Sequence, residues 1–133
     1  MTLDISSFEK AITRLTEGLS RYQQDINDDQ IRDGLIQRFE FTYELSHKIL
    51  KRYLESASAT PDLYDGMPFQ ELIRSGNEQG LLLGDWPTWK KYREMRGKTS
   101  HTYDETKALE VVGVVPAFLA EVVFLRDQLR QRA

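Results

Sequence analysis

One short segment of the chain, from Arg96 to Tyr103, holds side chains that could cleave a phosphodiester bond. It reads Arg-Gly-Lys-Thr-Ser-His-Thr-Tyr. Histidine titrates near neutral pH, so His101 could take a proton from a ribose 2′-hydroxyl or give one to a leaving 5′-oxygen. Arginine keeps its charge, so Arg96 could stabilise the negative charge that develops on the phosphate oxygens. This chemistry requires neither a metal ion nor a cofactor.

The residues just before and within this segment carry an excess of positive charge. Residues 90–98 contain five basic side chains and one acidic one, although the formal net charge of the whole chain is -3. Such a run is often only the solvated face of a helix. Alternatively, it attracts the phosphate backbone of a nucleic acid. The residues that we expect to bind RNA in that case are Lys90, Lys91, Arg93 and Lys98.

The chain has two histidines, and only His101 lies in this segment. His47 falls within a predicted helix, where we expect it to be partly buried with a local partner. The alternative for His101 is also structural, a histidine at a helix start bonded to nearby backbone. If His101 is catalytic, one histidine is too few for an acid and a base. A two-fold homodimer would bring two Arg–His pairs together.

Length and composition indicate a single soluble domain spanning residues 1–133. The absence of cysteine excludes disulfides and thiolate metal sites, and two distant histidines argue against zinc. The N-terminus lacks the basic and apolar regions of a signal peptide. The most apolar stretch, residues 111–125, is too short to span a bilayer. We therefore expect a cytoplasmic protein with no membrane partner.

The apolar periodicity is helical almost throughout, and no segment alternates with the period of a strand. The predicted fold class is all-α, an antiparallel up-and-down bundle of four main helices plus a short extra helix. The four main helices are expected from Ser6 to about Tyr22, at 29–56, from Asp85 to Gly97 and at 102–130, with the short one at 68–75.

The last predicted helix has more apolar positions than a bundle core needs. One stripe comprises Val111, Val115, Phe118, Val122, Leu125 and Leu129, and a second comprises Leu109, Val112, Leu119 and Val123. One stripe is enough for a core, so the second could be buried against another subunit. We expect Gly113 and Pro116 to kink or interrupt this helix.

Polar residues mark several predicted helix ends. Ser6 with Glu9, and Thr102 with Glu105, have the spacing of capping boxes. Gly97 is expected to end the fourth helix.

Within the second helix, Glu40 and Glu44 stand four residues apart. This pair is either part of a charged outer face or a surface for a basic partner. The aromatic residues Trp86, Trp89 and Tyr92 have two roles open to them as well, packing in the core or stacking on an unpaired base.

Three stretches of the sequence resemble the HEPN-domain proteins encoded beside minimal nucleotidyltransferases. An older label for this family is nucleotidyltransferase substrate-binding protein. The stretches are residues 4–11, 37–45 and 96–105, and the resemblance extends over nearly the whole chain. It implies a dimeric helical bundle that acts as a metal-independent ribonuclease toxin. Arg96 and His101 would be the catalytic pair, contributed by both protomers to one cleft.

The resemblance also implies a protein partner. In this family the cognate minimal nucleotidyltransferase is the antitoxin, and it transfers AMP from ATP onto the motif tyrosine, here Tyr103. An adenylylated tyrosine would put anionic bulk where the RNA phosphate must sit. Two departures from the family pattern are Gly97, where a polar Asn or Asp is usual, and His47, where a large aromatic is common. Gly97 could make cleavage slower.

Two other functions are compatible with the same residues. The chain could be a non-catalytic module that presents a substrate to the nucleotidyltransferase, with Arg96 and His101 binding rather than cutting. It could also be a dimerisation scaffold in which the motif is vestigial.

Overall fold

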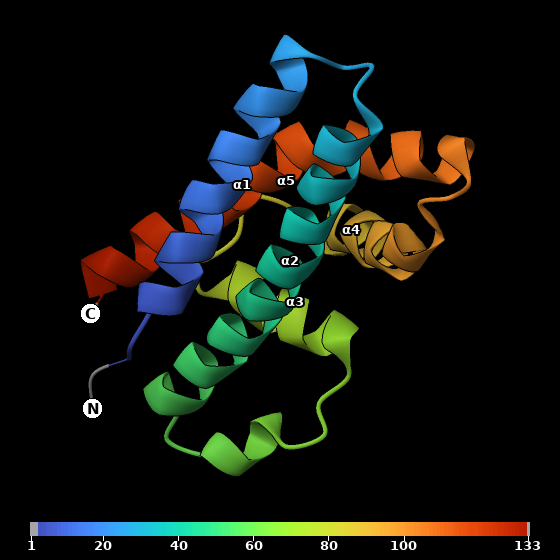
Figure 1. The fold of residues 1–133 in the computed structure, drawn as a ribbon. Helices are drawn as coiled ribbons and strands as arrows, with labels where there is room; N and C mark the ends of the chain where they lie inside the picture. The colour runs from blue at the N-terminus through green and yellow to red at the C-terminus, as the bar shows by residue number, and fades with distance from the viewer. Residues whose placement is uncertain (1–2, 133) are drawn as a thin grey trace.

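The computed structural model describes residues 3–132, and these form an all-helical bundle (Figure 1). The α-helices are α1 (Ser6–Gln24), α2 (Asp29–Ala57), α3 (Phe69–Glu78), α4 (Trp86–Lys98) and α5 (Glu105–Arg132), and the short 3-10 turns are η1 (Pro61–Tyr64) and η2 (Thr99–His101). The predicted bundle of four main helices and one short helix is confirmed. Met1, Thr2 and Ala133, at the ends of the predicted domain, lie outside the described residues.

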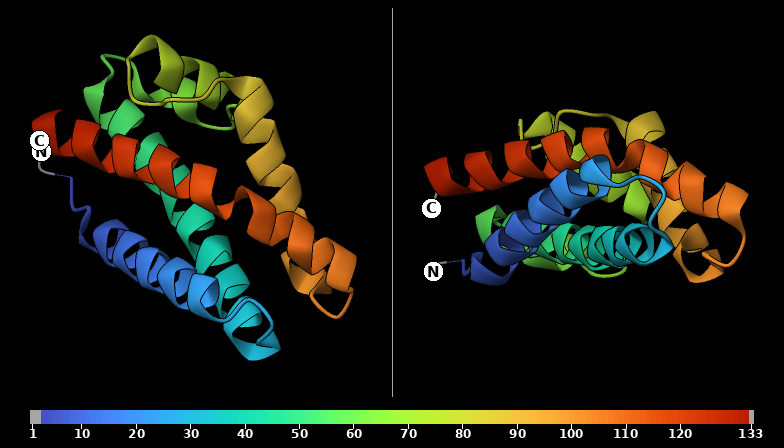
Figure 2. Two further views of the ribbon diagram at one scale, coloured as in Figure 1. Left: turned by 90° about the horizontal axis from the view of Figure 1, so that it is seen from above. Right: turned by 45° about the horizontal axis from the view of Figure 1, so that its top comes forward.

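α1 and α2 form an antiparallel hairpin, and α5 runs across one face of it with α4 beside its first half (Figures 1 and 2). Aromatic side chains fill the junction of these helices. Phe39 of α2 meets Phe118 of α5 edge to face, with ring centroids 4.9 Å apart, and Trp89 of α4 lies 6.2 Å from the same ring. Burial of such side chains contributes most of the folding free energy.

α5 supplies one complete side of the core. The predicted stripe from Val111 to Leu129 is buried throughout, whereas the second stripe packs only partly against the core and its Leu109 is 48% exposed. α5 is the one helix among the described residues that is long and apolar enough to cross a membrane. Its most apolar face is nevertheless already buried against the other helices.

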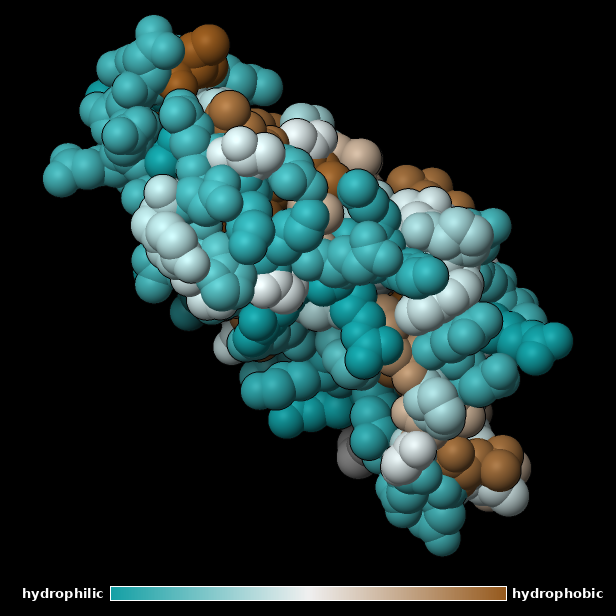
Figure 3. Space-filling model, turned by 90° about the vertical axis from the view of Figure 1, so that its right-hand side faces the viewer, coloured by the Kyte–Doolittle hydropathy of each residue, from teal (hydrophilic) through white to brown (hydrophobic). Residues whose placement is uncertain are grey.

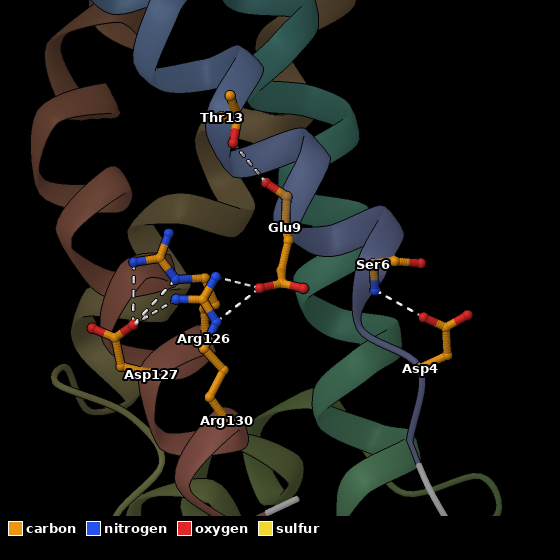
Figure 4. Close-up of polar contacts among 7 residues, drawn as sticks. All are labelled: Asp4, Ser6, Glu9, Thr13, Arg126, Asp127 and Arg130. Carbon is orange, nitrogen blue, oxygen red and sulfur yellow. Dashed lines mark hydrogen bonds and ion pairs between the residues drawn. The ribbon is translucent and has the colours of Figure 1, made fainter.

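The start of α1 differs from the prediction. The carboxylate of Asp4 accepts a hydrogen bond from the Ser6 amide at 2.9 Å, and no side chain caps the helix from the N-cap position, Ile5. Glu9 does not complete a capping box. It binds Arg130, which lies near the end of α5. The Nε of Arg130 donates to Glu9 Oε2 at 2.8 Å (Figure 4). This ion pair ties the last helix to the first.

The junction of α4 and α5 also departs from the prediction. α4 continues through Gly97, which has no left-handed backbone, and the chain then tightens into η2. α5 begins at Glu105, and the Lys107 amide in its first turn donates to the Asp104 carboxylate at 3.2 Å. Asp104, and not Thr102, therefore caps the start of this helix. The helix passes Gly113 and Pro116 without interruption. Both the end of α4 and the start of α5 thus fall later than predicted, and residues 99–104, which include η2, connect the two helices.

A buried carboxylate holds the loop between α3 and α4. Glu121 of α5 is only 2% exposed and accepts hydrogen bonds from the amides of Leu83 and Gly84, both at 2.7 Å. Burial raises the pKa of Glu121, and these two bonds oppose that shift. Gly84 is required by this close approach, because an added Cβ would lie 2.7 Å from Thr88 Cγ2 and 2.8 Å from Glu121 Oε1.

We therefore expect Gly84→Ala to lower the free energy of unfolding by about 1–3 kcal/mol, as overpacking does. Gly113→Ala is the matched control, because a Cβ there meets nothing within 4 Å. It should raise the free energy of unfolding by about 0.5–1 kcal/mol, the advantage of alanine within a helix. Urea denaturation followed by circular dichroism measures both. Equal effects of the two substitutions would contradict the role given to Gly84.

Candidate functional site

Arg96 lies in the last turn of α4 and is held by α2. Its Nε donates to Glu44 Oε1 at 3.1 Å, and its Nη2 contacts the same oxygen. The two side chains are 38% and 48% exposed, so the contact lies at the surface. The hydrogen bond to Glu44 raises the pKa of Arg96, so the guanidinium stays charged. Glu44 therefore fixes the direction of the Arg96 side chain.

A second carboxylate of α2 holds the turn that follows Arg96. The hydroxyl of Thr99, in η2, contacts Glu40 Oε2 and lies 2.8 Å from the carbonyl oxygen of Arg96. Glu40 and Glu44 stand one helical turn apart, so they meet α4 and η2 along the same face of α2. Glu44 is exposed, as expected for a charged outer face, and Glu40 is half-buried. The contacts of the two carboxylates with Arg96 and Thr99 were not predicted. The sequence feature that could have drawn attention to Glu40 and Glu44 is their four-residue spacing within the 37–45 stretch.

His101 ends η2 and lies beside Tyr103. Its Nδ1 is 3.3 Å from the Tyr103 hydroxyl, and the two rings are edge to face with centroids 5.9 Å apart. His101 is half-buried, whereas Tyr103 is 84% exposed. The Tyr103 side chain is thus accessible from solvent, and its hydroxyl lies within contact distance of the His101 ring.

A surface hollow of about 620 Å³ opens in front of Arg96. The residues that line it are Tyr43, Glu44, His47, Lys48, Phe69, Arg93, Arg96 and Gly97. An added Cβ at Gly97 would meet nothing within 4 Å, so the departure from the family pattern leaves open space there. His101 is not part of this lining. Among residues 3–132, no three His, Asp or Glu side chains gather closely enough to hold a metal ion.

The predicted RNA-binding residues are not equally placed. Arg93 lines the hollow, with its guanidinium 5.5 Å from the centre of the Phe69 ring. Lys98 is paired with Glu110 at 2.6 Å, and Lys90 and Lys91 are exposed on α4 outside the lining. The side of the molecule that carries the α4–α5 turn is mostly hydrophilic, with separate apolar patches (Figure 3).

The aromatic residues and His47 take structural roles in the described chain. Trp89 and Tyr92 are buried in the core, and Trp86 is half-buried against Phe69, with ring centroids 5.8 Å apart. His47 is half-buried and meets the Phe69 ring at 4.7 Å. Burial, followed by the nearby charges of Lys51 and Arg93, lowers the pKa of His47. These contacts agree with the local packing partner predicted for His47.

The bundle and the segment at its α4–α5 junction define a helical protein of the nucleotidyltransferase substrate-binding type. Residues 3–131 match the family described as nucleotidyltransferase substrate binding protein like, and the chain belongs to this family. It is 44% identical over 110 residues to the probable ribonuclease HepT of Haemophilus influenzae, an alignment that covers 83% of this chain and 75% of that protein.

A solved structure has the same fold. HI0074 from Haemophilus influenzae superposes with a TM-score of 0.88 at 35% sequence identity, covering 96% of this chain and 99% of the other. Its structure is described as the fold of a substrate binding domain of a nucleotidyltransferase. The resemblance seen in the three sequence stretches is therefore confirmed at the level of family and fold.

The contact between Arg96 and Glu44 should slow the exchange of the Arg96 side-chain protons with water. In Glu44→Gln we expect the Arg96 Nε–H to exchange with water faster, because its charged acceptor is lost. The free energy of unfolding should change by only about 0–1 kcal/mol, as for other exposed ion pairs. Proton-exchange NMR of the arginine side chains measures the first effect. Glu94→Gln, which removes the same charge from exposed Glu94 of α4, is the control, and an equal effect on Arg96 would refute the contact.

Proposed function

We propose that the chain is the toxin of a toxin–antitoxin system, an RNA endonuclease that works without a metal ion. The observation that carries this proposal is the Arg96–Tyr103 segment, held by α2, in a chain 44% identical to a probable ribonuclease. The first catalytic group is Arg96 and the second is His101. We also propose that the chain is cytoplasmic, because its RNA substrate would be found there.

The chemistry is a transesterification at phosphorus. A histidine takes the proton of the ribose 2′-hydroxyl while the 2′-oxygen forms a bond to phosphorus, and the bond to the 5′-oxygen breaks. A second histidine returns a proton to the departing 5′-oxygen. The guanidinium of Arg96 stabilises the charge on the non-bridging oxygens. Arginine has five N–H donors, and the two that contact Glu44 leave three for phosphate.

A two-fold dimer would supply the second histidine. Each chain has one histidine in the segment, and within a chain Arg96 faces a hollow that His101 does not line. A partner protomer would bring a second Arg96–His101 pair to one shared cleft, where the two His101 side chains could act as base and acid. The partly exposed second stripe of α5, with Leu109 48% exposed, offers an apolar surface for the contact.

Adenylylation of Tyr103 by a cognate minimal nucleotidyltransferase would switch the toxin off. The phenolic oxygen would attack the α-phosphorus of ATP and release pyrophosphate, leaving AMP on Tyr103. The modified oxygen is the one that lies 3.3 Å from His101 Nδ1. The new phosphodiester would place a negative charge beside His101 and compete with RNA phosphate.

A second candidate is a non-catalytic module that binds or presents a substrate for a nucleotidyltransferase. The description of the HI0074 structure as a substrate binding domain favours it. In that case Arg96 and His101 would bind a phosphate group without moving protons.

His101→Ala separates the two candidates. For the nuclease we expect RNA cleavage to fall by roughly 10²–10⁴-fold, the usual contribution of a general acid or base. Cells expressing this variant should grow normally, whereas cells expressing the parent sequence should stop growing. Gln23→Ala is the control, because Gln23 is an exposed residue of α1 that lines neither the Arg96 hollow nor the hollow between α1 and α2, and this variant should retain cleavage. Equal cleavage by the His101→Ala variant and the parent chain would exclude the nuclease.

Intact-mass measurement tests the modification. After incubation with the partner nucleotidyltransferase and ATP, the mass should rise by whole AMP groups, and Tyr103→Phe should abolish the rise. Tyr53→Phe, at a half-buried tyrosine of α2, should leave it unchanged. AMP that persists on Tyr103→Phe would contradict the assignment.

A further inference from the structure

A second hollow adjoins the one in front of Arg96. It measures about 450 Å³ and lies between α1 and α2. Its lining consists of Ser7, Lys10, Ala11, Arg14, Phe41, Glu44, Leu45 and Lys48. Glu44 and Lys48 line both hollows, so the two lie side by side along α2. One has Arg96 of α4 in its lining and the other has Arg14 of α1.

The lining of this second hollow combines apolar and cationic side chains. Phe41 and Leu45 are half-buried, while Lys10, Arg14 and Lys48 are exposed. Within residues 3–132, these three cations form no ion pair with a carboxylate. The carboxylate in the lining, Glu44, is already bound to Arg96.

Carboxylates also lie on the far side of the two α1 cations. Lys10 and Arg14 line a neighbouring hollow together with Glu9 and Glu17. Glu9 is bound to Arg130, so its charge is compensated. Glu17 forms no ion pair among the described residues, so it offsets part of the charge of Lys10 and Arg14 on that side. The hollow between α1 and α2 has Lys48 in addition, and its carboxylate is compensated by Arg96, so the positive charge predominates on the α2 side.

We propose that this second hollow binds a nucleotide of the RNA strand next to the cleaved phosphodiester. Its volume is within the range of small-molecule sites, about 300–1,000 Å³. A base would pack on Phe41 and Leu45, and the flanking phosphates would contact Arg14, Lys48 and Lys10. An apolar floor under a cationic rim matches a nucleotide, which has one aromatic face and one anionic edge. This inference rests on the proposed ribonuclease function and extends its substrate contacts to α1.

The test measures binding apart from cleavage. A fluorescent single-stranded RNA is titrated with the His101→Ala protein, with or without the added pair Arg14→Gln and Lys48→Gln. Each lost phosphate contact lowers the salt dependence of binding to a single strand by about 0.7 in log–log slope. We expect the pair to lower that slope by about 1.4 and the affinity by about tenfold or more at 0.1 M salt.

Two controls guard against general effects of charge and stability. Arg21→Gln with Arg52→Gln removes the same charge from exposed positions of α1 and α2 that do not line the hollow, and should change affinity less than threefold. Phe41→Leu keeps an apolar side chain but removes the aromatic face. We expect it to weaken binding to the intact RNA, and to have no effect when the RNA carries an abasic site at the bound position.

Equal affinity of the lining pair and the control pair would overturn the proposal. If the parent chain still cleaves RNA in that case, the proposed function stands and only the second hollow is wrongly assigned. Loss of dimerisation in the lining pair, measured by sedimentation and with RNA affinity retained, would show that the hollow is a protein interface. If the His101→Ala protein binds no RNA, both this inference and the proposed function are wrong.

Discussion

The contact between Arg96 and Glu44 joins residues 52 positions apart and determines where the candidate site lies. An exposed ion pair contributes only about 0–1 kcal/mol to folding, so its main effect is on orientation. It points the guanidinium into the hollow between α2 and α4. The Thr99–Glu40 contact, one turn away on α2, holds η2 and thereby the turn that carries His101. The geometry of the segment thus depends on a helix outside it.

The same contact also sets the electrostatics of the candidate site. Glu44 compensates the charge of Arg96, so an approaching phosphate must share the guanidinium with a carboxylate. Arginine can do this because its donors form a planar fork with more than one face. Lysine, with a single charged nitrogen, would be a poorer replacement for Arg96 here. Two further cations, Arg93 and Lys48, line the same hollow, and under the proposed function they would attract the RNA backbone.

The sequence predicted the helices and their buried faces well, because apolar spacing of three and four residues is local information. It failed at several ends, where the choice between neighbouring polar groups depends on backbone geometry. The carboxylate of Asp4, not the hydroxyl of Ser6, accepts a hydrogen bond from the first amide of α1, and α4 continues past Gly97. Glu44 could not be assigned to Arg96 from sequence, because their approach follows from how α2 packs against α4. A spacing pattern within one helix carries no such information.

The central claim is that histidine acts as acid and base while the 2′-hydroxyl of the RNA attacks the neighbouring phosphate. The chemical ends of the cleavage products test this claim most directly. Purified chain is incubated with RNA in excess chelator, and the termini are identified by mass spectrometry. We expect 2′,3′-cyclic phosphate and 5′-hydroxyl ends, and no cleavage on the 3′ side of a 2′-deoxynucleotide, which lacks the attacking hydroxyl. Cleavage that leaves 5′-phosphate ends, or that stops when the chelator is added, would contradict this mechanism.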